Sequence, residues 1–393
     1  MYDYLIVGAG ILGLSTAYSL KNKYPKSRIA VVEKENSYCM HQSGNNSNVI
    51  HSGIYYKPNS KKALNCKKGY TLLLDFLKEN KLPYDICGKL IVAINESEEL
   101  ELMKIFKNGK LNGLQNLKIL NKEDIKKHEP NVSGFKAIHV PQAGITDYKL
   151  VSKKIYDILI NKNVKFYFNY EVKDLIQNKN EIKVLDKNNK IIESNYVINI
   201  AGLYSDKLAK LTTKIQHKIV PFRGEYYDLK PTASHLVKNL IYPVPNPNFP
   251  FLGVHFTRTV SGKIESGPNA VFAFSREGYN FYDFKIKEFI ESIFYSGFIK
   301  IAFRFWKDGL KEIYRSINKK AYLKSMQKLI PTISIDDIEK GGSGVRAQAI
   351  KRNGDMVDDF LITKNGKVIN VCNAPSPAAT ACFAIGEEIT NLI

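Results

Sequence analysis

Three glycines near the start of the sequence have a spacing that could bind a dinucleotide. Gly8, Gly10 and Gly13 follow the apolar run 4–7 and precede a helical pattern. Gly8 permits a tight turn, Gly10 lets the backbone approach a pyrophosphate, and Gly13 lets the helix pack closely against the strand. Glu33 ends a second apolar run at the spacing where an acid binds ribose hydroxyls. This context indicates a βαβ nucleotide site with the phosphates at the helix N-terminus.

Later polar segments favour FAD over NAD as the dinucleotide. The loop 43–47 reads Ser-Gly-Asn-Asn-Ser and can bind phosphate and ribitol oxygens through backbone and amide donors. The pair Ala201-Gly202 ends a middle strand, and segments 341–346 and 373–380 return near the C-terminus. The residues that we expect to contact the cofactor are Gly8, Gly10, Gly13, Glu33, Ser43, Asn45, Asn46, Val172, Ala201, Gly202, Gly344, Val345, Ala378, Ala379 and Thr380.

The segment 373–380 also predicts the start of the last helix. Ser376 can N-cap a helix that has Pro377 at its first position. The positive end of that helix would stabilise negative charge on a reduced flavin ring, and the alternative is an ordinary capped helix. We expect FAD to be held without a covalent bond, while His51 and Cys372 are the side chains that could attach it instead.

The elements around these segments predict a discontinuous α/β architecture. A Rossmann-like FAD-binding domain comprises residues 1–82, 145–215 and 331–393, and a β-rich (α+β) substrate domain comprises residues 83–144 and 216–330. Hairpins are expected to turn at 188–189 and 365–366. Further strands are expected at 28–33, 84–94, 133–141, 164–170, 196–200 and within 217–275 with Pro-rich breaks at 243–250, and helices at 14–23, 66–80, 150–162 and 285–328.

The composition excludes several classes of protein. The 393 residues are 44% hydrophobic, as in an ordinary globular protein of about two or three domains. No apolar run approaches the roughly 18 residues of a spanning helix, and Met1 directly precedes a strand pattern, so we expect no span and no signal peptide. The five cysteines are scattered without a C-x-x-C pair. We therefore expect no metal, no disulfide framework and a reduced, cytoplasmic compartment.

The net charge of +20 comes from 58 Lys+Arg against 38 Asp+Glu. Most lysines are scattered, and no RNA-binding module is visible, so we expect no nucleic-acid partner. The segment 285–328 is denser, with eleven basic and four acidic residues among apolar side chains such as Phe303 and Trp306. Two interpretations stay open: a face that docks peripherally on an anionic membrane, or a solvated helical lid.

The sequence resembles the FAD-dependent oxidoreductases of the D-amino-acid-oxidase type, and within them the L-2-hydroxyglutarate oxidase/dehydrogenase family. The resemblance spans residues 3–390, with 285–328 the least similar part. It implies an enzyme that oxidises L-2-hydroxyglutarate to 2-oxoglutarate by hydride transfer to FAD, and that passes the electrons to a quinone or to oxygen. The ordered blocks that carry it are 43–56, 223–229, 242–258, 267–270, 344–348, 358–362 and 371–380.

Such a reaction needs a base for the hydroxyl proton, and two histidines qualify. His51 is the first candidate because it follows the predicted FAD-contacting loop, and imidazole has a suitable pKa. His255, in a predicted strand of the substrate domain, is the rival. Either histidine could instead hydrogen-bond its own loop or strand, so the assignment stays open.

The two carboxylates of the implied substrate favour arginine, whose planar fork binds them bidentately. Arg346 is the first candidate because it lies in a segment expected to face the flavin, Arg258 is the second and Arg223 the third, although ion-pair roles are equally compatible with each. Tyr56, Tyr226 and Thr257 complete the expected substrate contacts.

Three rival functions remain. A flavin amine or amino-acid oxidase of the same fold would need no cationic site for a second carboxylate. A glycerol-3-phosphate dehydrogenase would share the pattern His51-Ser-Gly53, but the block 253–257 fits neither rival as well. The net charge would suit an FAD-containing RNA-modification or RNA-binding protein. Against this function, the sequence contains no paired catalytic cysteines. The oligomeric state is not determined by any of these features.

Overall fold

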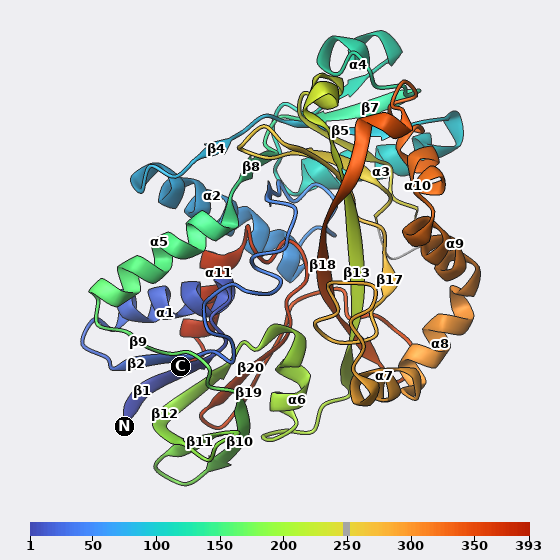
Figure 1. Cartoon of the computed structure of the whole chain (residues 1–393). Helices are drawn as coiled ribbons and strands as arrows, with labels where there is room; N and C mark the ends of the chain where they lie inside the picture. Colours follow the sequence, from blue (N-terminus) through green and yellow to red (C-terminus); the bar gives the residue numbers. More distant parts are fainter. Residues whose placement is uncertain (247–251) are drawn as a thin grey trace.

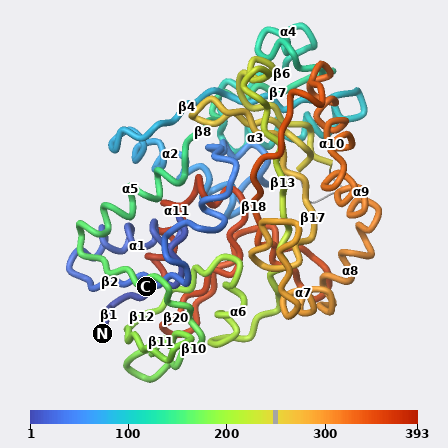
Figure 2. The backbone as a smooth tube through the Cα atoms, viewed as in Figure 1, coloured from blue at the N-terminus to red at the C-terminus, as the bar shows by residue number. Residues whose placement is uncertain are grey.

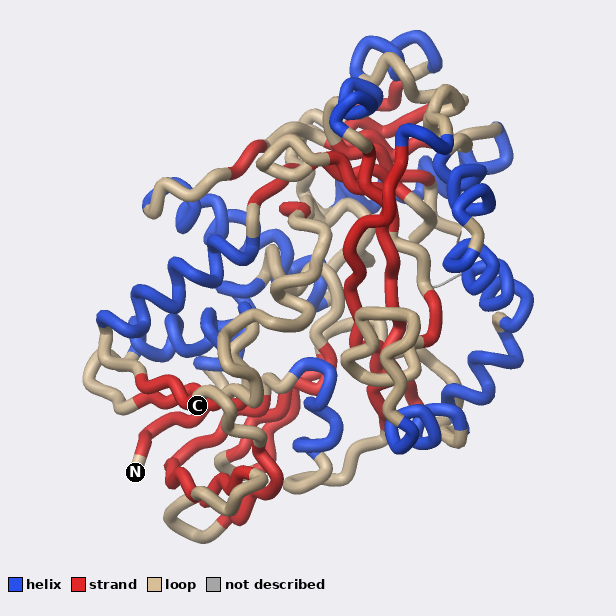
Figure 3. Tube along the Cα trace, viewed as in Figure 1, coloured by secondary structure: helices blue, strands red, loops and turns tan. Residues whose placement is uncertain are grey.

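The structure of the chain is a computed structural model that describes residues 1–246 and 252–393 (Figure 1). Residues 247–251, which belong to the predicted Pro-rich break at 243–250 and to the block 242–258, lie outside the described residues. Two large sheets organise the described chain, and helices cover them on the outside (Figure 3).

The first sheet is assembled from three separate parts of the chain. Its strand order is β10-β11-β12-β1-β2-β9, with β20 paired to β12 and to β19. Parallel pairing joins β1 to β2 and β12, and β12 to β20. The strands are β1 (Tyr2–Val7), β2 (Ile29–Val32), β9 (Lys165–Tyr167), β10 (Val172–Gln177), β11 (Ile182–Asp186), β12 (Ile191–Asn199), β19 (Leu361–Asn365) and β20 (Val368–Asn373).

Three helices pack on this sheet because the parallel strands are apolar on both faces. They are α1 (Ile11–Lys23), α5 (Tyr148–Asn161) and α11 (Cys382–Thr390), and their apolar side chains share one buried cluster with β1 and β2. The tube in Figure 2 shows the blue α1 beside the red α11, and the Ser15 hydroxyl donates to the Cys382 carbonyl at 2.9 Å. The predicted Rossmann-like α/β class is confirmed.

The second sheet is mostly antiparallel and has the order β17-β13-β16-β15-β14-β5-β7-β6, with β18 paired to β13. The pair β13–β18 runs through the centre of Figure 1 and sets Phe222 opposite Arg346 and Gly224 opposite Gly344. The strands are β5 (Lys89–Ala93), β6 (Lys118–Leu120), β7 (Lys136–Val140), β13 (His217–Leu229), β14 (Leu240–Pro243), β15 (His255–Arg258), β16 (Ile264–Gly267), β17 (Val271–Phe272) and β18 (Ile338–Lys351).

The division of the chain into domains stays a prediction. One strand bears on it: β18 falls in the predicted FAD-binding segment 331–393, yet its partner β13 belongs to the second sheet. A small sheet has the order β3-β8-β4 and consists of β3 (Val49–Ile50), β8 (Gly144–Thr146) and β4 (Tyr84–Asp85). Further helices are α2 (Lys61–Glu79), α3 (Glu99–Leu111), α4 (Lys122–His128) and α6 (Ser205–Ala209).

The basic segment 285–328 is helical as predicted, but it forms several short helices. They are α7 (Ile286–Ile293), α8 (Ser296–Arg304), α9 (Trp306–Ile317) and α10 (Lys319–Met326), and they line the outer edge beyond β17 and β18 (Figure 1). Asn318 separates the last two by accepting the Ala321 N–H at 3.1 Å, as a helix N-cap does. None of the described helices combines the length and the apolar composition that crossing a bilayer requires.

Both predicted hairpin turns are confirmed, and one helix start is wrong. Asn189 and Gly366 adopt the left-handed conformation between β11 and β12 and between β19 and β20. The predicted start of the last helix at Ser376-Pro377 is wrong. The helix begins at Cys382, and Ala381 is its N-cap. The predicted positive helix end is therefore displaced toward the C-terminus by several residues.

Candidate cofactor site and active site

A cavity of about 760 Å³ lies between the two sheets and is the main candidate site. This volume falls in the range of about 300–1,000 Å³ that holds small molecules and cofactors. It is lined by thirteen of the fifteen predicted cofactor contacts: Gly8, Gly10, Glu33, Ser43, Asn45, Asn46, Val172, Ala201, Gly202, Gly344, Val345, Ala378 and Ala379. Gly13 and Thr380 are not in the lining. Gly13 packs against the Gly8 carbonyl, and the Thr380 hydroxyl accepts the His51 N–H.

The glycine turn has no room for side chains. Gly8 has a φ of +111°, and a Cβ there would lie 2.4 Å from the Ile200 carbonyl oxygen. A Cβ on Gly13 would lie 1.9 Å from the Gly8 carbonyl oxygen, so this glycine sets how closely α1 approaches β1. The start of α1 can therefore approach a pyrophosphate closely, with Gly8 and Gly10 of the turn in the cavity lining.

Two side chains fix the loops around this turn. The Glu33 carboxylate accepts the Ala9 N–H at 2.8 Å and the Glu35 N–H at 3.1 Å. The Ser43 hydroxyl accepts the Ile11 N–H at 2.9 Å, so the loop 43–47 is tied to the first turn of α1. The donor and acceptor set therefore fits FAD: glycines and a helix N-terminus for the phosphates, and a carboxylate at the ribose position.

His51 lines the cavity where the first part of the chain meets the last. Its backbone N–H donates to the Thr380 hydroxyl at 3.0 Å, and its Nε2 lies 3.3 Å from the Ser376 hydroxyl. Burial, together with the charges of Lys89 and His255, lowers the pKa of His51 to about 3. The imidazole is therefore neutral at pH 7 and can accept a proton. Ser376 hydrogen-bonds this ring instead of capping a helix.

His255 lies deeper, on a face of the second sheet. Its Nδ1 donates to the Gly253 carbonyl at 2.9 Å, which leaves Nε2 as an acceptor, and its ring stacks on Tyr242 at 4.0 Å between centroids. Burial, with the charges of Lys89 and Arg346, lowers the pKa of His255 to about 3. His255 is not in the cavity lining, and the choice between it and His51 as base stays a prediction.

The three predicted arginines lie in different surroundings. Arg346 is exposed to the cavity from β18. Arg223 also lines the cavity, but its guanidinium is paired with Glu225 at 3.1 Å and with the Asn280 carbonyl at 3.1 Å. Arg258 forms an ion pair with Asp85 and lies outside the cavity lining. The geometry thus favours Arg346 for a substrate carboxylate.

The other predicted substrate residues gather around the same face. Tyr226 lines the cavity, close enough to Arg346 for that charge to act on its hydroxyl. Thr257 hydrogen-bonds Tyr242, and Tyr56 hydrogen-bonds Ser376 beside His51. Their roles stay predictions: Tyr226 is in the cavity lining, and Tyr56 and Thr257 are not.

Sequence reasoning missed two residues here, Lys89 and Tyr242. Strand alternation puts both on the face of His255 and Thr257, while Leu90, Ile241 and Phe256 point into the apolar cluster on the other face. The Lys89 ammonium lies 4.0 Å from the centroid of the Tyr242 ring. The only local signal was a lysine at the head of an otherwise apolar strand, residues 89–93.

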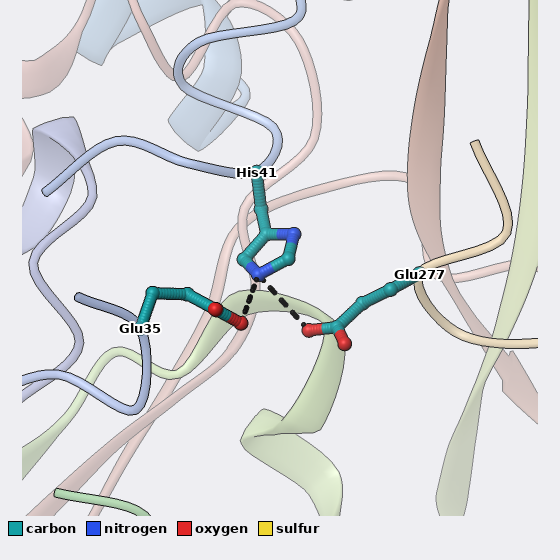
Figure 4. A group of neighbouring side chains, drawn as sticks. All are labelled: Glu35, His41 and Glu277. Atoms are coloured by element: carbon teal, nitrogen blue, oxygen red, sulfur yellow. Dashed lines mark hydrogen bonds and ion pairs between the residues drawn. The ribbon is translucent and has the colours of Figure 1, made fainter. Parts of the chain in front are cut away.

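A third missed residue is His41, which belongs to a polar cluster at the other end of the cavity (Figure 4). Its Nε2 lies 2.9 Å from Glu35 and 3.0 Å from Glu277, so it links the loop after β2 to the segment before α7. These are metal-ligand types. However, Lys34 forms ion pairs with both carboxylates and already supplies the cation between them.

This cavity, with its glycine turn and the neutral His51 in its lining, has the features of a dinucleotide-dependent redox enzyme. The chain belongs to the FAD-dependent oxidoreductases, since the sequence profile of that family matches residues 3–392. FAD is accordingly its cofactor.

Within this family the chain is similar to proteins named L-2-hydroxyglutarate dehydrogenase. It is 44% identical to one from Indibacter alkaliphilus, covering 99% of this chain and 98% of that protein. It is 39% identical to one from Escherichia coli K12, covering 100% and 93%, and 42% identical to the mitochondrial protein of Homo sapiens, covering 99% and 88%.

Solved structures support the fold. The chain aligns with FAD-bound, dithionite-reduced L-α-glycerophosphate oxidase from Mycoplasma pneumoniae at a TM-score of 0.81 and 24% identity, covering 100% of this chain and 94% of that one. It aligns with glycine oxidase from Bacillus cereus at 0.72 and 16%, with the same coverage. At these identities the likeness establishes the architecture alone.

Proposed function

We propose that this chain oxidises L-2-hydroxyglutarate to 2-oxoglutarate. The observation that carries the proposal is full-length similarity, at 39–44% identity, to three proteins that share the name L-2-hydroxyglutarate dehydrogenase. The site supports it, because the positive charges of Arg346 and Lys89 both act on His255. A hydroxy acid with two carboxylates complements such an arrangement, whereas a neutral amine does not.

When bound, FAD supplies the acceptor for the hydride that leaves C2 of the substrate. The chain binds the carboxylates, positions C2 and takes the hydroxyl proton. Arg346 holds the carboxylate next to C2, and His51 accepts the proton from the hydroxyl. Burial is the main cause of the lowered pKa of His51, and the charge of Lys89 adds to it. Negative charge arriving with the substrate opposes the effect of Lys89 and makes His51 more basic.

Anaerobic bleaching of the flavin tests this function. L-2-hydroxyglutarate should bleach the yellow protein and yield 2-oxoglutarate, while D-2-hydroxyglutarate, glycerol 3-phosphate and amino acids should leave the absorbance unchanged over the same time. Bleaching by glycerol 3-phosphate or by an amino acid alone would assign the chain to one of the rival functions.

We also propose that the FAD is not covalently attached. The Cys372 thiol is a poor nucleophile, because burial raises its pKa to about 11. Acid precipitation should release the yellow colour into the supernatant. Colour retained in the pellet would show a covalent bond and contradict the proposal.

The electron acceptor forms a separate part of the proposal: we infer a quinone reached by peripheral docking on the inner face of the cytoplasmic membrane, with oxygen as the alternative. The helices α7 to α9 and the loop before them form an exposed apolar surface. Its large side chains are each more than a third exposed: Tyr282, Phe284, Ile286, Ile290, Phe294, Ile299, Phe303, Trp306, Leu310, Ile313, Tyr314 and Ile317.

The charge around this apolar surface suits anionic lipid. The segment 285–328 carries a net +7, from eleven basic and four acidic residues. Each cation close to an anionic bilayer contributes about 1 kcal/mol of attraction, and apolar side chains add the energy of insertion. A solvated lid, the alternative, would gain nothing from exposing this many aromatic and aliphatic side chains.

Vesicle flotation distinguishes docking from a lid. Full-length protein should float with anionic vesicles and not with neutral ones, and replacing the lysines at 311, 319, 320, 324 and 328 by glutamate should abolish flotation. The control reverses three exposed lysines outside this segment, at 104, 107 and 110 on α3, and should still float. Absence of flotation at low salt would contradict docking and favour a soluble acceptor or oxygen.

A further inference from the structure

Lys89 is a deeply buried cation without an anionic partner. Only 2% of its surface is exposed. Within residues 1–246 and 252–393, no acidic side chain or carbonyl accepts a hydrogen bond from its ammonium. Burial lowers the pKa of Lys89 to about 8, so the group is still mainly charged at pH 7.

The other buried cations of the described chain all have acceptors. Arg223 pairs with Glu225, Arg276 donates to Asp206 at 2.9 Å, and Lys62 pairs with Asp358 at 2.6 Å. Lys21 donates to the Pro25 carbonyl at 2.9 Å. A buried charge without a partner lowers the stability of the fold. Lys89 therefore differs from the four buried cations named above, each of which has an acceptor.

Aromatic rings lie beside the Lys89 ammonium, and no anion among the described residues pairs with it. Its ammonium lies over the rings of Tyr242, at 4.0 Å, and Tyr55, at 5.4 Å. The Tyr55 hydroxyl is buried and has no hydrogen-bond partner within the described part of the chain. An unsatisfied hydroxyl donor beside an unpaired ammonium offers two donors to a single anion.

The position of Lys89 relates it to the reaction. It begins β5, next to β14, and shares a face of the sheet with His255 and Thr257. Its charge acts on both His51 and His255, and the charge of Arg346 acts on His255 as well. Two cations from different strands, Lys89 of β5 and Arg346 of β18, therefore act on His255, and Lys89 also acts on His51.

We propose that Lys89 binds the second carboxylate of the substrate, the one remote from the hydroxyl carbon, with the Tyr55 hydroxyl as its co-donor. This inference rests on the proposed function. Arg346 and Lys89 then hold the two ends of a dicarboxylate, and the hydroxyl carbon is placed near the histidines between them. Lys89 is a specificity-determining residue that selects diacids over monoacids.

Binding of two non-reacting acids tests the proposal. Glutarate has both carboxylates and pentanoate has one, and neither has a hydroxyl to oxidise, so the perturbation of the flavin absorbance reports binding alone. In Lys89→Met holoenzyme, glutarate should bind about 10- to 100-fold more weakly, as expected for loss of a charged hydrogen bond, and pentanoate should bind as before. Lys89→Arg should retain part of the preference for glutarate.

The matched control is Lys21→Met, which removes another buried lysine at the far end of α1 and should leave both affinities unchanged. Equal weakening of glutarate and pentanoate in Lys89→Met would overturn the proposal, since it would show a structural role with Tyr242. If that variant fails to fold, the wild type decides: no preference for glutarate over pentanoate overturns the proposal. Failure of the proposed function differs, because wild-type flavin would then not be bleached by L-2-hydroxyglutarate whatever the glutarate affinities are.

Discussion

The proposed cofactor and substrate sites would recognise their ligands by different means. At the cofactor site the backbone predominates, because Gly8 and Gly13 have no side chains and Ser43 ties a loop to α1. The proposed substrate site depends on side chains from separate strands, Lys89 of β5 and Arg346 of β18, of which Arg346 is in the cavity lining. Backbone recognition depends on a local turn, and side-chain recognition depends on the register of a whole sheet. The two ends should therefore fail differently when single residues are changed.

The largest effect should come from the backbone end. In Gly13→Ala, the new Cβ would meet the Gly8 carbonyl oxygen at 1.9 Å, so α1 must move away from β1. We expect the purified protein to be colourless and its free energy of unfolding to fall by about 1–3 kcal/mol. Flavin absorbance per protein and thermal melting measure both effects.

The control for Gly13→Ala is Gly309→Ala in α9, where a Cβ meets nothing within 4 Å. That variant should stay yellow and be slightly more stable, because alanine favours a helix over glycine. A Gly13→Ala protein with full flavin content would show that the turn tolerates side chains, and the contrast between the two ends would be lost.

A smaller effect is expected at the substrate end, where cofactor binding should survive. His51→Ala should keep its flavin but lower the rate of anaerobic reduction by about 10²- to 10⁴-fold, with weaker effects on binding, because a base acts in the transition state. Stopped-flow absorbance gives the rate. His235→Ala, on an exposed turn, is the control and should reduce at the wild-type rate. If the rate of flavin reduction is unchanged in His51→Ala and lowered in His255→Ala, the base that accepts the proton is His255.

The pH dependence should also separate the two ends. Lys89, with its pKa lowered to about 8, is cationic below that pH and neutral above it. The value of kcat/KM for the diacid should therefore fall as pH rises through about 8 to 9, while the flavin content stays constant. His51, with a pKa near 3, stays neutral above about pH 5 and should cause no loss on the acid side there. An alkaline limb that persists in Lys89→Met would assign it to another group.

The smallest effect should come from Arg258, the second arginine that the sequence suggested for a carboxylate. Its partner Asp85 is 49% exposed, and exposed ion pairs contribute about 0–1 kcal/mol. Arg258→Ala should therefore leave glutarate affinity and the reduction rate within about twofold of wild type. By contrast, Arg346→Met removes a side chain of the cavity lining and should weaken the binding of glutarate about 10- to 100-fold in the same titration. Similar losses in both variants would bring Arg258 back into the site.

These contrasts explain what could be predicted from the sequence. The glycine turn, the role of Glu33 in it and the two hairpin turns could be predicted because each depends on residues close along the chain. The hairpin turns are at Asn189 and Gly366. Lys89 and Tyr242 were not, since they meet His255 only after β5, β14 and β15 pair side by side. A lysine at the first position of an apolar strand does not indicate which face of the sheet its side chain will occupy.

The wrong helix start has a physical cause of the same kind. Ser376 and Pro377 satisfy local capping preferences, yet segment 374–381 folds against distant residues instead. The Thr380 hydroxyl accepts the His51 N–H and lies 2.9 Å from the Tyr148 hydroxyl. These long-range contacts outweigh a cap that contributes about 1 kcal/mol, so the helix begins only at Cys382.

The dependence of His51 on Thr380 also dictates an order of events during synthesis. The glycine turn is made first, but its sheet lacks β20, and its helix α1 lacks α11, until the segment 368–390 has left the ribosome. The nucleotide turn is therefore made long before the strand and the helix that complete its packing. We expect FAD to be bound only after segment 368–390 has been synthesised.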